Sequence, residues 1–129
     1  MNDTWLEIEK DKLLDKFAEL VEAKKIIILS TISGYQDGDN IYLLYHLVLS
    51  GQGSVNLRVS VPLSNPVLPS VEKLVPAAIL YEREIQDILG VKFEGISDSR
   101  RLILPEHWPD GVYPLRKDFK MNKEAQKNG

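Results

Sequence analysis

The chain has 129 residues, of which 43% are hydrophobic and 27% charged, and this composition is typical of a single folded domain with one core. Its net charge of −3 gives no electrostatic footprint for nucleic acid, and the absence of cysteine excludes disulfides, cysteine-ligated zinc and cysteine-held iron–sulfur clusters. No apolar run reaches the roughly 18 residues of a membrane span and the N-terminus is unlike a signal peptide, so we expect a cytoplasmic location.

The first predicted element is a helix over residues 2–21. Thr4 as N-cap and Glu7 three residues later match a capping box, which marks a helix start. The apolar stripe of this helix contains Trp5 and Phe17. We therefore expect both aromatic side chains in the core.

Three apolar or β-branched runs follow, at 26–33, 41–50 and 56–62. The links between them are short and rich in turn residues, which predicts antiparallel neighbouring strands. His46 lies in the middle run, where a hydrogen-bonded core imidazole is expected rather than a ligand. Three prolines at 62, 66 and 69 predict a connector without helix or sheet ladder, and Ser70 is expected to cap a short helix after it.

The clearest helix is predicted over residues 77–89. Tyr81, Ile85 and Leu89 recur on one apolar face together with Ile88, and charged residues fill the opposite face. Gly90 suits the left-handed position just past the end of the helix.

The predicted fold class is α+β. It has an N-terminal helix, an antiparallel sheet of three to four strands, helices packed on one face, and an irregular C-terminal docking segment. We expect one domain over residues 1–119 and a polar tail over residues 120–129.

The most specific signal is the stretch from Tyr81 to Phe119, called the motif segment below. It combines turn residues, arginines and aromatics, a composition that predicts a surface covered by another protein. Residues 1–91 carry 8 Lys and Arg against 13 Asp and Glu, whereas residues 92–129 carry 8 Lys and Arg against 6 Asp and Glu. The second part of the chain is therefore the more basic one, which suits an acidic partner or simply maintains solubility. The candidate site residues are Glu82, Arg83, Glu84, Asp87, Gly90, Phe93, Gly95, Arg100, Arg101, Trp108, Pro114, Leu115, Arg116, Lys117 and Asp118.

These residues, in this order, resemble the C subunit of the NADH:quinone oxidoreductase (complex I) superfamily, which includes a subunit of membrane-bound energy-converting nickel–iron hydrogenases. The resemblance begins with the sequence Glu-Arg-Glu at 82–84 and the glycines that follow it. It continues with the Arg100-Arg101 pair and the apolar strand-like run 102–104, and it ends with the sequence Pro-Leu-Arg-Lys-Asp-Phe at 114–119. One departure is Ile96, where the family usually has His or Lys. Together with the stretch from Leu104 to Pro109, this departure favours the hydrogenase branch over the NADH-linked one.

The resemblance implies a non-catalytic structural subunit in the peripheral arm of a membrane-associated oxidoreductase. The implied partners are a hydrogenase-type large catalytic subunit and an iron–sulfur small subunit, on the cytoplasmic side of the membrane. It also implies that this chain binds no cofactor, no metal and no nucleic acid.

The carboxylates of the predicted helix allow two further interpretations. In one, Glu84 and Asp87 serve a free-standing small-molecule enzyme; in the other, helix carboxylates pair with arginines through bidentate bonds and hold the following loop to the helix. Spacing favours the second, because no histidine lies near them in sequence. Arg116 is expected to remain partly exposed and to anchor the interface.

Overall fold

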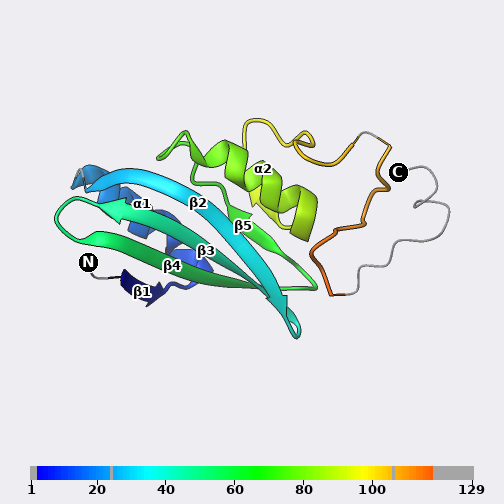
Figure 1. The fold of residues 1–129 in the computed structure, drawn as a ribbon, viewed down its shortest axis with the longest axis horizontal. Helices are drawn as coiled ribbons and strands as arrows, with labels where there is room; N and C mark the ends of the chain where they lie inside the picture. Colours follow the sequence, from blue (N-terminus) through cyan, green and yellow to red (C-terminus); the bar gives the residue numbers. More distant parts are fainter. Residues whose placement is uncertain (1–2, 24, 106, 118–129) are drawn as a thin grey trace.

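The computed structural model describes residues 3–23, 25–105 and 107–117. They form a four-stranded sheet with helices on one face, which confirms the α+β class (Figure 1). In spatial order the strands are β1 (Asp3–Glu7), β4 (Gly53–Pro62), β3 (Asn40–Leu49) and β2 (Ile26–Asp37). A small second sheet pairs β5 (Val67–Pro69) with β6 (Lys92–Glu94). The helices are α1 (Leu13–Glu22), which follows the 3-10 turn η1 (Lys10–Lys12), and α2 (Ala78–Leu89).

The strands β2, β3 and β4 form the predicted antiparallel meander. A tight turn joins β2 to β3, with Asp37 opposite Asn40 and Gly38 at a positive φ of 60°. Along β3, buried residues alternate with half-buried ones, as expected when helices cover only one face of a sheet. The covered face therefore holds the core, and the other face remains open.

The N-terminal helix prediction is wrong in its first half. Residues Asp3–Glu7 form β1, which pairs in parallel with β4, and the α-helix begins only at Leu13. The backbone groups along the free edge of β4 need partners, and five residues of β1 supply them, which outweighs the capping-box pattern of Thr4 and Glu7. Trp5 is consequently 56% exposed rather than in the core, whereas Phe17 is buried as predicted.

The connector after β4 also differs from the prediction. Residues Val67–Pro69 form a parallel ladder with β6, which arrives from beyond α2. Ser70 does not begin a helix; its Oγ accepts the Glu72 N–H at 3.1 Å in a turn that leads to α2. Proline cannot donate to a ladder, but its carbonyl can accept: the Lys92 N–H donates to the Pro66 carbonyl at 2.8 Å. At the other end the Ser70 N–H donates to the Glu94 carbonyl at 2.8 Å, so the three-residue pairing forms despite Pro66 and Pro69.

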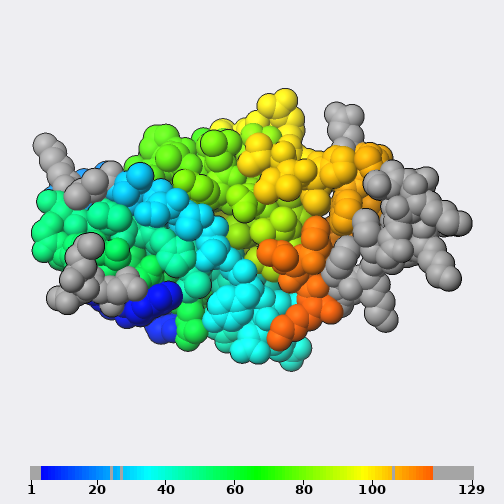
Figure 2. Space-filling view, in the orientation of Figure 1, coloured from blue at the N-terminus to red at the C-terminus, as the bar shows by residue number. Residues whose placement is uncertain are grey.

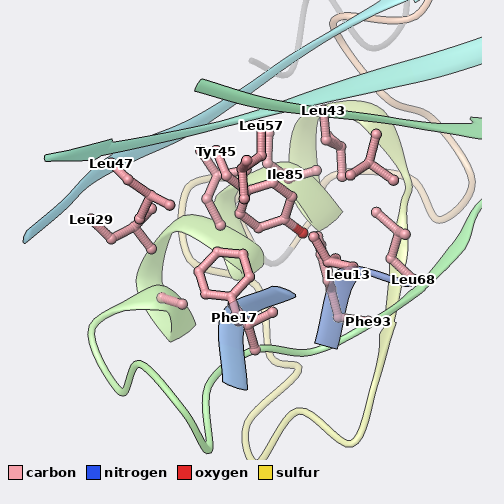
Figure 3. Packing of buried hydrophobic residues seen from close by; sticks show 14 of the residues in the cluster. Leu13, Phe17, Leu29, Leu43, Tyr45, Leu47, Leu57, Leu68, Ile85 and Phe93 are labelled. Carbon is pink, nitrogen blue, oxygen red and sulfur yellow. The ribbon is translucent and has the colours of Figure 1, made fainter. Parts of the chain in front are cut away.

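The core lies between the sheet and both helices (Figure 3). Phe17 of α1 packs edge-on against Tyr45 of β3, with 5.4 Å between ring centroids. Ile85 and Leu89 of α2 are buried, which confirms the predicted apolar face of that helix, and Gly90 ends it at φ 76°. The Tyr45 hydroxyl is buried and makes no hydrogen bond to any residue that the structure describes.

A row of hydrogen bonds crosses the open face of the sheet. The His46 ring lies 2.9 Å from Ser33 Oγ through Nε2 and 2.5 Å from Asn56 Oδ1 through Nδ1. Asn56 Nδ2 in turn donates to the Thr4 carbonyl at 3.3 Å, so the row includes all four strands. The imidazole is hydrogen-bonded as predicted, although it is half-buried on the open face.

Candidate functional site

The motif segment begins within α2, and this helix is covered on two sides. One side faces the sheet, and the other carries residues 97–105 and 107–117, which have no regular secondary structure. In the space-filling view their atoms lie against those of α2 (Figure 2). The sequence predicted that the charged residues of α2 face solvent. Instead, Glu82 is fully buried and Asp87 is 5% exposed. Glu82 points into the turn that follows β5, and Asp87 points into the residues after the arginine pair.

Glu82 ties α2 to the turn that precedes it. Its carboxylate accepts hydrogen bonds from Ser70 Oγ at 2.6 Å and from the Val71 N–H at 2.9 Å. Burial raises the pKa of the Glu82 carboxyl, and the two hydrogen bonds oppose that rise. Glu82 therefore holds the start of the motif segment to the residues that follow β5.

Asp87 organises the apolar run that follows the arginine pair. Its Oδ2 accepts the backbone N–H groups of Leu102 at 2.8 Å, Ile103 at 2.7 Å and Leu104 at 3.2 Å. A single carboxylate oxygen thus fixes three consecutive residues as a bend, whereas the resemblance implied a strand-like run at 102–104. The side chains of Leu102 and Ile103 remain 42% and 52% exposed.

Arg83 holds the preceding turn from the same face of α2. Its Nε donates to the Arg100 carbonyl at 2.9 Å, and its Nη2 donates to the Arg101 carbonyl at 3.1 Å. Its Nη1 lies 3.6 Å from Asp98 Oδ2. Arg83 and Asp87 together determine the path of residues 98–104.

The predicted pairs between helix carboxylates and loop arginines are replaced by other pairs. Arg100 binds Asp98 through Nε at 2.9 Å and Nη2 at 2.8 Å, and Arg101 Nη2 binds Asp110 at 2.6 Å. The hydrogen bonds from Arg100 hold the pKa of the Asp98 carboxyl well below its usual range, with the charge of Arg83 adding to the effect. Sequence reasoning missed Asp98 and Asp110, although the Asp-Ser-Arg spacing at 98–100 is typical of a local side-chain turn.

Arg116, near the end of the motif segment, binds the C-terminus of α2. Its Nε donates to the Leu89 carbonyl at 2.7 Å, and its guanidinium stacks over the Tyr113 ring at 4.6 Å. A cation there bonds an otherwise unpaired helix carbonyl and complements the helix dipole. Arg116 is half-buried and bonded within the chain, so the structure gives it a role in the fold that the sequence did not predict.

The remaining motif residues have separate positions. Phe93 is buried in the core, and Gly95 takes a φ of 82° after β6. Trp108 Nε1 donates to the Val112 carbonyl at 2.8 Å, and the Lys117 N–H donates to Gln36 Oε1 at 2.8 Å. Pro114 is half-buried and Leu115 is 54% exposed. Asp118, Phe119 and the predicted tail lie outside the described residues.

The two carboxylates proposed for a small-molecule enzyme are not found together in the cavity that Asp87 borders, as far as its described lining goes. Asp87 borders a small cavity of about 210 Å³ with Trp108 and Tyr113, and Glu84 is not among the residues that line it. Asp87 is moreover occupied by three backbone N–H groups. Within 3–23, 25–105 and 107–117, no cluster of three or more His, Asp or Glu side chains is placed to hold a metal ion, and no helix is long and apolar enough to cross a membrane.

Comparison with known proteins gives a consistent result. The family described as respiratory-chain NADH dehydrogenase, 30 kDa subunit, matches residues 6–125. The C subunit of the NADH-quinone oxidoreductase of Moorella thermoacetica is 34% identical over 123 residues, covering 93% of this chain and 82% of that protein. Membrane-bound hydrogenase subunit beta of Pyrococcus furiosus is 41% identical over 96 residues, covering 70% of this chain and 56% of that protein.

A solved structure shares the fold. It is the membrane-bound sulfane sulfur reductase, an archaeal respiratory membrane complex, in which a chain with 28% identity aligns with a TM-score of 0.74 over 98% of this chain and 78% of that one. Some curated relatives are much longer than this chain, and in one of them the matched region is 14% of the length.

Proposed function

Because this chain belongs to the family of the respiratory-chain NADH dehydrogenase 30 kDa subunit, whose members are subunits of multi-subunit respiratory or hydrogenase complexes, we propose that it is a non-catalytic structural subunit of such a complex. It sits in the peripheral arm on the cytoplasmic side of the membrane. It docks through the motif segment on a hydrogenase-type large catalytic subunit, beside an iron–sulfur small subunit, and binds no cofactor itself.

The observation that carries this proposal is the turn around Asp87. Leu102 and Ile103 are two consecutive large apolar side chains, both exposed, on a backbone that one buried carboxylate holds in place. Ordering a loop before binding lowers the entropy lost on association, and exposed apolar side chains gain most when a partner covers them. A pre-formed apolar surface is therefore what a permanent contact between two subunits requires.

The hydrogenase branch is the more specific form of the proposal. The motif segment supports it through Ile96, at a position where the family usually has a basic residue, and through the Leu104–Pro109 stretch. In the structure, Ile96 packs against the hydrophobic core. A basic side chain could not replace it there without either leaving that contact or losing its hydration.

The test is affinity purification of the tagged chain from its native membranes, followed by mass spectrometry and by assays of hydrogen-linked and NADH-linked reduction. Ile103→Asp is the test variant. Ile28→Asp is its matched control, because Ile28 is also 52% exposed but lies on β2 rather than in the motif segment. Each variant replaces an exposed isoleucine with aspartate, so both proteins are expected to stay folded.

The wild-type chain and Ile28→Asp are expected to recover a large catalytic subunit and cluster-containing proteins, and Ile103→Asp is expected to lose them. The active assay then identifies the branch. A chain that elutes alone in all three forms, or one with turnover of its own, contradicts the proposal.

A further inference from the structure

Three arginine side chains of the motif segment meet in one open concavity. Arg83, Arg100, Arg101 and the carboxylate of Asp110 line a hollow of about 540 Å³ on the surface beside α2. Resting on the docking function proposed above, we propose that this hollow receives a carboxylate side chain of the partner protein, which displaces Asp110 from Arg101.

Among the described residues that form the hollow, guanidinium groups outnumber carboxylates. Asp98 forms part of its structure, since it accepts two bonds from Arg100 and lies 3.6 Å from Arg83 Nη1. Asp110 is the second carboxylate. Among the described residues, three guanidinium groups therefore face two carboxylates, which favours a carboxylate over a cation as the incoming group.

Asp110 occupies the hollow in a way that allows exchange. Its side chain is fully exposed, and its described contact is the ion pair with Arg101 Nη2 at 2.6 Å. Ion pairs this exposed contribute little free energy, so a competing carboxylate can replace Asp110 at low cost. Arg101 would stay in position, because its Nη1 also donates to the Pro105 carbonyl at 3.0 Å.

Arg100 provides a further site for the incoming group. Its side chain is 84% exposed, and its described hydrogen bonds all go to Asp98, through Nε, Nη2 and the backbone N–H. The Nη1 donors take no part in these bonds. Because Arg101 directly precedes the exposed Leu102 and Ile103, the partner that fits is an acidic residue followed closely by apolar surface.

The experiment is an NMR titration of the full chain that follows the arginine Nε–H signals. The probe is a capped peptide of glutamates, with a lysine peptide of the same length and inorganic phosphate as comparisons. The variants are Asp110→Asn, which removes the competing carboxylate, and Arg100→Gln, which removes one guanidinium. Arg58→Gln is the control, because Arg58 also forms an exposed ion pair, with Glu7, on the open face of the sheet.

The glutamate peptide is expected to bind about two- to fivefold more tightly to Asp110→Asn and about two- to fivefold more weakly to Arg100→Gln, with Arg58→Gln unchanged. Equal affinities for all four forms, or binding of phosphate without the peptide, would overturn the inference.

These outcomes are separate from those of the docking proposal. If Ile103→Asp loses its partner in the purification but the glutamate peptide does not bind, docking stands and the carboxylate site falls. If the peptide binds with the expected order of variants but no form of the chain recovers a partner, the site stands as a carboxylate-binding hollow on an isolated protein, and the link to docking is lost.

Discussion

Asp87 Oδ2 accepts the backbone N–H of Ile103 at 2.7 Å, in the middle of three consecutive N–H groups that share this oxygen. A helix side chain thereby sets the conformation of a loop that lies 15 to 17 residues further along the chain. The exposed side chains of Leu102 and Ile103 depend on this contact for their position.

Asp87→Ala leaves these N–H groups without their acceptor and is expected to lower the free energy of unfolding by about 2–3 kcal/mol. Glu84→Ala on the same helix is the control, expected to cost less than about 0.5 kcal/mol, because Glu84 is half-buried and no hydrogen bond is described for it. Chemical denaturation measures both. Hydrogen exchange at Leu102, Ile103 and Leu104 should accelerate only in the first variant, and equal costs for the two would contradict the role of Asp87.

Gly90→Ala is expected to destabilise the fold more than Gly95→Ala does. Both glycines have positive φ, at 76° and 82°, so each alanine costs about 1–2 kcal/mol in backbone strain. A Cβ at Gly90 would also overlap Cε2 and Cδ2 of the Tyr113 ring, whereas a Cβ at Gly95 meets no atom of the described chain within 4 Å. The overlap should add about 1 kcal/mol or more at Gly90.

Most of the added cost at Gly90 should be removed in a Tyr113→Ala background, where the ring is absent. The added Cβ would still lie 2.7 Å from Arg116 Nη2, but that atom is the end of a flexible side chain. A double-mutant cycle measured by denaturation isolates this coupling. Coupling near zero would show that the close approach of Tyr113 does not constrain position 90.

Tyr45→Phe is expected to leave stability unchanged or to raise it by up to about 1 kcal/mol. The Tyr45 hydroxyl is buried without a hydrogen bond to the described residues, and burial followed by the charge of Glu82 raises the pKa of its phenol. Thermal and chemical unfolding of the two proteins give the comparison. A loss above about 1 kcal/mol would indicate that the hydroxyl has a partner, such as a buried water.

Glu82→Gln is expected to change how stability depends on pH. Because the pKa of Glu82 is raised in the folded state, the folded protein binds more protons at this carboxyl than the unfolded protein does. The contribution of Glu82 to the free energy of unfolding therefore falls as the pH rises from about 4.5, the ordinary pKa of glutamate, through the raised pKa of the folded state. Glutamine cannot ionise, yet it can still accept from Val71 N–H. The free energy of unfolding of the wild type, relative to this variant, should therefore decrease with pH over that window; a constant or rising difference contradicts the assignment.

Arg116→Ala is expected to cost about 1–2 kcal/mol, because the Leu89 carbonyl loses its donor and the end of α2 loses its cation. Arg116→Lys keeps the charge but not the guanidinium stack over Tyr113, so it should recover only part of this loss. Denaturation of the chain without its partner separates this effect from any effect on assembly. No loss in either variant would return Arg116 to the purely interfacial role predicted from the sequence.

The sequence alone determined those features that depend on neighbours along the chain. The spacing of Ile85 and Leu89, with Gly90 after them, predicted a helix over 77–89, and the structure places it at Ala78–Leu89. Short turn-rich links predicted the antiparallel meander. The order of the motif residues indicated the family, which the comparisons confirm.

Only the tertiary structure decided which distant groups pair. Residues Asp3–Glu7 carry a helix-start pattern, but the free edge of β4, about fifty residues away, makes them a strand. Helical spacing places Glu82 and Asp87 on a solvent-facing side, but other segments cover both. The turn after β5 covers Glu82 and the residues after the arginine pair cover Asp87, so both carboxylates are buried and bind backbone N–H groups. Periodicity reports which residues share a face, whereas burial of that face and the partners of its charges depend on segments that meet only when the chain folds.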